Sequence, residues 1–126
     1  MARAQEFEAT SSSWTTEVSD RTGSVAAISI VDNPGAWTDL AADSVALRNL
    51  SPTVVEVAWK GAACTDCAHF DLTPGDGNGL ELRYDLGSPA DRCVTRTDTI
   101  LVYALDIRFI APVDVARITA VPSCGP

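Results

Sequence analysis

The sequence predicts an all-β fold, and three observations lead to this fold class. Apolar and polar residues alternate with a period of two in several segments, as in a strand with one buried and one solvated face. Turn-forming residues separate these segments at short intervals. No segment shows the strand-then-helix alternation of a βα protein. The 126 residues fit one domain and are enough to bury a core.

The clearest alternation occurs in residues 80–86 and 99–110. In each segment, apolar side chains occupy every second position and charged side chains fall between them. Successive side chains of a strand point to opposite faces, so one set should face the core. We therefore expect both segments to be strands with the following side chains inside: Leu82, Tyr84, Leu105, Ile107 and Phe109.

Shorter runs predict the remaining strands. Residues 25–31 are apolar and partly β-branched, and residues 55–60 alternate in a phase that places Trp59 in the core. Further strands are expected at 44–50 and 117–121. Many short strands joined by Pro/Gly turns predict a single antiparallel β-sandwich of immunoglobulin-like or jelly-roll type.

The immunoglobulin likeness is limited to architecture. An immunoglobulin domain places a tryptophan between two cysteines on facing strands. Here Trp59 precedes all four cysteines, and the first two cysteines lie only three positions apart. No family motif accompanies the predicted sandwich.

The N-terminal segment differs in composition from the rest of the chain. Ser, Thr and charged residues dominate it, so we divide the chain into a polar arm, residues 1–22, and a sandwich domain, residues 23–126. Each ordered residue costs about 1–2 kcal/mol of backbone entropy, which a polar segment cannot recover alone. We expect the arm to lie along a sheet edge of its own domain or of an adjacent copy. Phe7 and Trp14 would anchor it, and Trp37, in a Pro–Gly loop, is a third candidate contact.

Charge and hydropathy exclude two classes of partner. The net charge of −8 and the pI of about 4.3 make binding to phosphate backbones or anionic lipid headgroups unfavourable. The longest apolar run, residues 100–105, is far too short to span a bilayer. We expect neither nucleic-acid binding nor membrane insertion.

Four cysteines offer most of the available chemistry: Cys64, Cys67, Cys93 and Cys124. An even count in a small β domain is the usual pattern of disulfide staples, and four cysteines allow three pairings. We expect two disulfides, with Cys93 bonded to Cys64 or Cys67. Closing loops of about 25–30 residues should stabilise the fold by roughly 3–4 kcal/mol each on the chain-entropy model.

Zinc binding or thiol chemistry is the alternative use of these cysteines. The four thiolates could form a structural site, or His69 could replace one of them. Structural zinc sites commonly use two closely spaced ligand pairs, whereas only Cys64 and Cys67 are closely spaced here. A redox C-x-x-C pair normally opens a helix, which the flanking sequence does not predict.

No catalytic constellation is visible, so we expect a protein that is not an enzyme and holds no cofactor. His69 is the one histidine, and no nucleophile-elbow motif is present to position a serine beside it. The glycine-rich run at 75–79 precedes a strand rather than the helix that a dinucleotide site requires. Glycine there serves a hairpin turn.

These observations favour a non-catalytic structural or interaction module that binds a protein partner or copies of itself. A repeated subunit of an extracellular, cell-surface or virion-type assembly fits the ordered arm and the disulfide pattern, and predicts an extracytoplasmic location. The alternative is a Cys/His zinc-binding or thiol-active small domain. A third interpretation is a sandwich that binds a glycan or another small ligand through its tryptophans.

Overall fold

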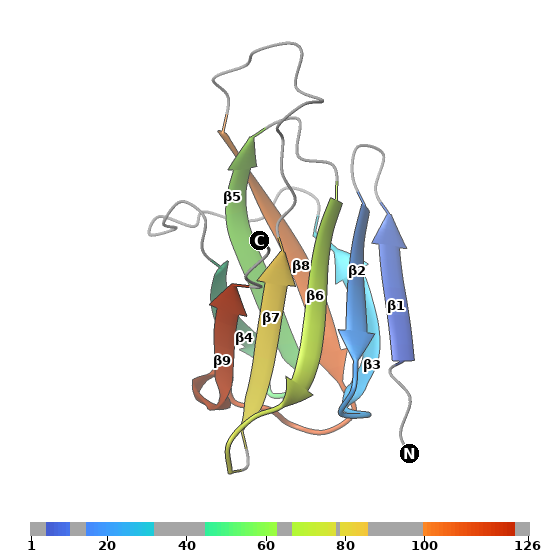
Figure 1. Cartoon of the computed structure of the whole chain (residues 1–126), viewed down its shortest axis with the longest axis vertical. Coiled ribbons are helices and arrows are strands. Elements are labelled where there is room, and N and C mark those ends of the chain that lie inside the picture. The colour runs from blue at the N-terminus through green and yellow to red at the C-terminus, as the bar shows by residue number, and fades with distance from the viewer. Residues whose placement is uncertain are drawn as a thin grey trace.

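The computed structural model describes residues 5–10, 15–31, 45–62, 67–77, 79–85 and 100–122, and the structural statements below concern these residues. They form two packed sheets (Figure 1). The five-stranded sheet has the following order: β1 (Gln5–Thr10), β2 (Thr15–Asp20), β6 (Cys67–Pro74), β7 (Leu80–Asp85) and β9 (Ile118–Pro122). The four-stranded sheet has the following order: β3 (Val25–Ile30), β8 (Ile100–Phe109), β5 (Val54–Ala62) and β4 (Val45–Ser51). A short 3₁₀ helix, η1 (Val115–Arg117), precedes β9.

The predicted all-β sandwich is confirmed. The segments with the clearest alternation form β7 and β8, and all five side chains expected inside them are buried. Trp59 is buried on β5, as its phase predicted. The finer distinction between immunoglobulin-like and jelly-roll types stays a prediction.

The two sheets differ in strand direction. Every pair of the four-stranded sheet is antiparallel, as expected. In the five-stranded sheet, β2 pairs with β6 and β7 pairs with β9 in parallel, so this sheet is mixed rather than wholly antiparallel. Parallel neighbours need a crossover connection. Here the segments between β2 and β6, and between β7 and β9, form this connection and contribute strands to the four-stranded sheet. Local alternation carries no information on such pairings.

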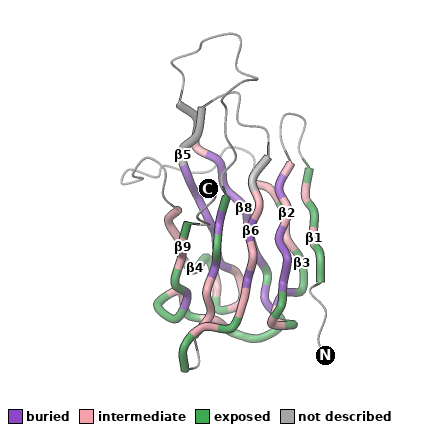
Figure 2. Tube along the Cα trace, in the orientation of Figure 1, coloured by how far each residue is buried: buried purple, intermediate pink, exposed green. Residues whose placement is uncertain are grey.

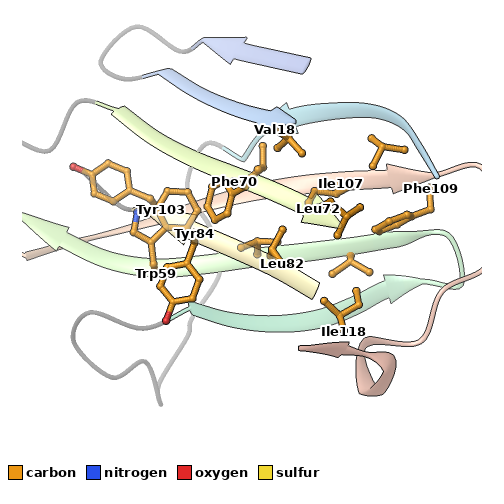
Figure 3. Packing of buried hydrophobic residues seen from close by; sticks show 14 residues of the cluster. Val18, Trp59, Phe70, Leu72, Leu82, Tyr84, Tyr103, Ile107, Phe109 and Ile118 are labelled. Atoms are coloured by element: carbon orange, nitrogen blue, oxygen red, sulfur yellow. The ribbon is translucent and has the colours of Figure 1, made fainter. Parts of the chain in front are cut away.

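The core fills the space between the sheets, and its residues separate into two groups (Figure 3). Aromatic rings gather towards one end: Trp59 stacks on Tyr103 with ring centroids 5.9 Å apart and lies tilted against Phe70 at 5.3 Å. Aliphatic side chains fill the other end, together with Phe109. Figure 2 shows the buried positions running up the middle strands, with exposed residues at the lower end of the molecule.

The polar N-terminal residues belong to the sheet. β1 and β2 form an antiparallel hairpin, and β2 pairs in parallel with β6. Val18 is fully buried in the core, so residues before position 22 contribute to the sandwich interior. The division into a polar arm, residues 1–22, and a sandwich domain, residues 23–126, stays a prediction. Within the part of the chain that the structure describes, no helix is long and apolar enough to cross a membrane.

Candidate interaction groove at one end of the sandwich

Most of the expected cysteine site lies outside the described residues. Cys64, Cys93 and Cys124 are not among them, and Cys67 is the first residue of β6, where only the backbone is described. Disulfide formation and zinc binding by these residues therefore stay predictions.

His69 lies on the outer face of the five-stranded sheet, in register with Glu17 on β2 and Asp85 on β7. Its Nδ1 is 3.5 Å from Glu17 Oε1, and its Nε2 is 3.7 Å from Asp71 Oδ2. The ring thus lies close to two carboxylates. Within the described ranges, no group of three or more His, Cys, Asp or Glu side chains could hold a metal ion.

Phe7 is the one expected interaction residue whose surroundings are described. It lies on β1 opposite Val18, is half-buried and packs against the core of its own sandwich. Trp14 and Trp37 lie outside the described residues. A role for these three aromatic residues in partner binding stays a prediction.

A groove lies at the lower end of the sandwich in Figure 1, where the β2–β3, β4–β5 and β8–η1 connections come together. It has a volume of about 990 Å³. The following residues line it: 23–24, 49–52, 110–114, Leu80 and Arg117. We call it the loop-end groove. Segments far apart in the chain meet here because β2, β4 and β8 end, and β3 and β5 begin, at this edge.

Asn49 holds two walls of the loop-end groove together. Its Nδ2 donates to the carbonyl oxygens of Ser51, at 3.1 Å, and Val113, at 2.8 Å. Its Oδ1 accepts from the Val115 N–H at 3.0 Å. The Val113 N–H also donates to the Pro52 carbonyl at 2.9 Å. These bonds fix the chain between β8 and η1 against the end of β4.

The third wall of the groove is the turn between β2 and β3. Asp20, 1% exposed, accepts from the N–H and Oγ1 of Thr22 and from the Val25 N–H, at 2.8, 2.6 and 2.9 Å. Gly23 has φ +71°, which glycine adopts without strain. The Ile110 N–H then donates to the Ser24 carbonyl at 2.8 Å and ties this turn to the end of β8. The frame of the groove is therefore hydrogen-bonded on all three sides.

Two apolar side chains stand out from this frame. Leu50 is 49% exposed and Ile110 is 69% exposed, and they are the large hydrophobic residues classed as exposed in the described part of the chain. Both line the groove, together with Pro52, Ala111 and Pro112. Full burial of one such side chain is worth about 1.5–3 kcal/mol, and here much of that gain is left unrealised. A gathering of apolar side chains rimmed by polar ones is typical of a binding site.

Charged residues border the groove near η1. Asp114 caps η1 by accepting the Ala116 N–H at 2.9 Å through Oδ1, and Arg117 lies at the other end of the helix. Among the described residues, the Arg117 guanidinium makes no hydrogen bond or ion pair. Arg117 and Leu80 also line a smaller adjoining groove of about 550 Å³. An exposed cation and an exposed carboxylate thus flank the apolar surface.

Sequence reasoning missed the loop-end groove, although one signal pointed to it. Leu50 is out of phase with Val45 and Leu47, which pack against the core, and Ile110 directly follows the inward-facing Phe109. An apolar residue on the solvent side of an alternating strand is the pattern that could have identified them.

A second site of electrostatic interest lies on the outer face of the four-stranded sheet. Asp106 on β8 is directly opposite Glu56 on β5, which in turn binds Arg48 of β4 through Nη2 at 2.7 Å. The Asp106 Oδ1 is buried without a hydrogen-bond partner. Burial raises the pKa of the Asp106 carboxyl above its usual value, the Glu56 charge raises this pKa further, and Arg48 partly opposes both.

Comparisons with family models, curated proteins and solved structures yield no match for this chain. The functional argument therefore rests on the geometry of the loop-end groove.

Proposed function

We propose that this protein is a non-catalytic interaction module that binds a protein segment in the loop-end groove. The observation that carries the proposal is the pair of exposed apolar side chains, Leu50 and Ile110, held on a hydrogen-bonded frame. A rigid apolar surface loses little conformational entropy on binding, so the ordering cost that opposes affinity is small.

The chemistry of the lining favours a protein segment. The apolar surface is built from Leu50, Pro52, Ile110 and Pro112 and is bordered by Arg117. It suits an aliphatic or aromatic side chain accompanied by a carboxylate, since the Arg117 guanidinium has no partner within the described residues. Apolar contacts surrounded by a polar rim are the usual anatomy of a protein–protein interface.

The proposal is tested by selecting a random displayed peptide library on the wild-type protein. The affinity of the enriched peptides is then measured for the wild type and for the Leu50→Ser/Ile110→Ser variant. Because both side chains are exposed, the double substitution should change the free energy of unfolding by only about 0.5 kcal/mol. Enriched peptides should carry an apolar residue near an Asp or Glu and bind the variant at least about tenfold more weakly.

A matched control is Val121→Ser, which removes an aliphatic side chain from β9 outside the groove. Peptide affinity for this variant should equal that of the wild type. Failure to enrich any peptide, or enriched peptides that bind the double variant unchanged, would rule out the groove as the binding site.

An extracytoplasmic location is part of the same proposal and rests on the expected disulfides. Mass measurement of the intact, unreduced protein tests it: two disulfides lower the mass by about 4 Da relative to the fully reduced chain. Four free thiols with a zinc adduct would instead favour the metal-binding alternative.

A further inference from the structure

The charges at the loop-end groove are self-complementary. Asp114 and Arg117 flank the same apolar surface, both are exposed, and they carry opposite charges. The Asp114 Oδ1 accepts from the Ala116 N–H, and within the described ranges its other oxygen accepts no hydrogen bond. In a two-fold contact both copies present the same patch. Any contact between one residue and a different residue of the partner therefore occurs twice. A surface with one cation and one anion can therefore satisfy both charges with a second copy of itself.

Charge disfavours self-association through the outer face of the five-stranded sheet. The outer face of the five-stranded sheet carries a row of Glu8, Glu17, His69 and Asp85 in register across four strands. Two copies of this face would bring carboxylates together, which costs free energy through like-charge repulsion. The net charge of −8 adds a general repulsion in any contact between copies, so a self-contact must bring opposite charges together. The loop-end groove combines exposed apolar side chains with one cation and one anion.

We propose that the occupant of the loop-end groove is a second copy of this chain, docked about a two-fold axis. Leu50 and Ile110 of the two copies pack together, and Arg117 of each copy pairs with the partner's Asp114. This inference rests on the proposed function, because it uses the same groove and names its partner.

The size of the groove sets the expected strength. Thirteen residues line it, whereas a standard interface uses about 20–30 residues on each side. The dimer should accordingly be weak, with a dissociation constant on the order of 10–100 μM. The protein should then be largely monomeric at low micromolar concentration.

The test is analytical ultracentrifugation of the full chain over a concentration series through that range, on two charge-reversal variants and their mixture. Arg117→Glu places two like-charged pairs in the proposed dimer, and so does Asp114→Arg. Each variant alone should dimerise at least about tenfold more weakly than the wild type. Mixed in equal amounts, the two variants form two attractive pairs across the contact. The mixture should form heterodimers with an affinity within about threefold of the wild type.

Control variants separate charge from folding. Arg108→Glu makes the same charge change at an exposed arginine outside the groove and should leave dimerisation unchanged. Thermal melting checks that Asp114→Arg, which loses the η1 cap, remains folded at the temperature of the measurement. If Asp114→Arg unfolds, a mixture of Arg117→Glu and Asp114→Asn tests the same contact. Their heterodimer has one attractive Arg117–Asp114 pair and one neutral pair in place of two repulsive ones. The mixture should therefore dimerise more tightly than Arg117→Glu alone.

Three results would overturn the two-fold contact: a wild-type protein that stays monomeric at several hundred micromolar, Arg117→Glu dimerising as well as the wild type, or a mixture that gives no heterodimer. If the wild type is monomeric but selected peptides bind the groove, only the dimer inference fails. If neither dimer nor peptide binding occurs, the proposed function fails as well.

Discussion

Asp20 and Asp106 are both carboxylates on strands of the sandwich, and their surroundings are opposite. Asp20 ends β2 and receives three hydrogen bonds from the turn that follows it. Asp106 lies within β8, has a buried oxygen without a partner, and is directly opposite another carboxylate, Glu56. Asp20 is the more deeply buried of the two, yet the structure satisfies it fully.

The hydrogen-bond donors around a carboxylate, rather than its depth of burial, decide whether that carboxylate stabilises this fold. Removing a charge from water is costly unless hydrogen bonds replace the lost hydration. Backbone N–H groups in a tight turn are free to point at Asp20, because no strand partner uses them. The backbone groups around Asp106 are committed to its neighbouring strands, β3 and β5.

The largest expected effect comes from Asp20→Ala. The Val25 and Thr22 N–H groups would lose their acceptor, and buried donors left without a partner cost about 1–3 kcal/mol each. We expect the free energy of unfolding to fall by roughly 2–4 kcal/mol in urea denaturation. Asp20→Asn, which keeps one acceptor oxygen, should lose less. A loss below about 1 kcal/mol for the alanine variant would contradict this account.

A smaller loss is expected for Asn49→Ala, because Asn49 also binds backbone groups but is exposed to water. Water can replace part of its hydrogen bonding, so the free energy of unfolding should fall by about 1–2 kcal/mol. Faster hydrogen exchange at the Val115 amide would show that the β8–η1 segment has been released. Unchanged exchange there would mean that Asn49 does not hold this wall of the groove.

Asp106→Asn should stabilise the protein. The substitution removes the charge facing Glu56, and like charges directly opposite in a sheet destabilise by roughly 0.2–1 kcal/mol. At pH 7 the variant should therefore unfold at a higher urea midpoint than the wild type, with a free energy of unfolding larger by that amount. As a matched control, Asp85→Asn changes an exposed carboxylate opposite His69 and should bring no such gain.

The smallest expected effect is the pH dependence of the stability difference between Asp106→Asn and the wild type. The folded pKa of Asp106 lies above its ordinary value of 3.8, so between these two values the native state holds more protons than the unfolded state. Wild-type stability therefore falls as pH rises through this window. The advantage of Asp106→Asn should be small near pH 3.8 and grow to its full size above the folded pKa. If the extra stability of Asp106→Asn is the same at every pH, it does not come from ionisation of Asp106.

How much the sequence could predict depends on the range of the interaction. Alternation in residues 80–86 and 99–110 identified β7 and β8 and their buried faces, because strand facing is a local property. The composition of the N-terminal residues suggested an arm, although Val18 is fully buried. The buried face of β2 carries the polar residues Thr16 and Asp20 beside Val18, so average composition does not reveal that this strand faces the core.

The loop-end groove depended on contacts that no local pattern encodes. Asn49 reaches the Val113 carbonyl and the Val115 N–H, and Ile110 reaches Ser24. These partners lie far apart in the chain and meet only because their strands end at the same edge. The phase of Leu50 and Ile110 could have indicated an exposed apolar surface, but not the frame that carries it.

The parallel pairings have a consequence for how the chain acquires its structure. β2 cannot find β6 until three strands of the other sheet have been synthesised, and β8, which lies between β3 and β5, comes later still. At roughly 5–20 residues per second on the ribosome, the early strands wait for seconds with unpaired edges. Neither sheet can close before residues 100–122 emerge, because they supply β8 and β9. Such non-local topologies fold slowly, so the unpaired strand edges of the nascent chain stay exposed to aggregation until its last strands arrive.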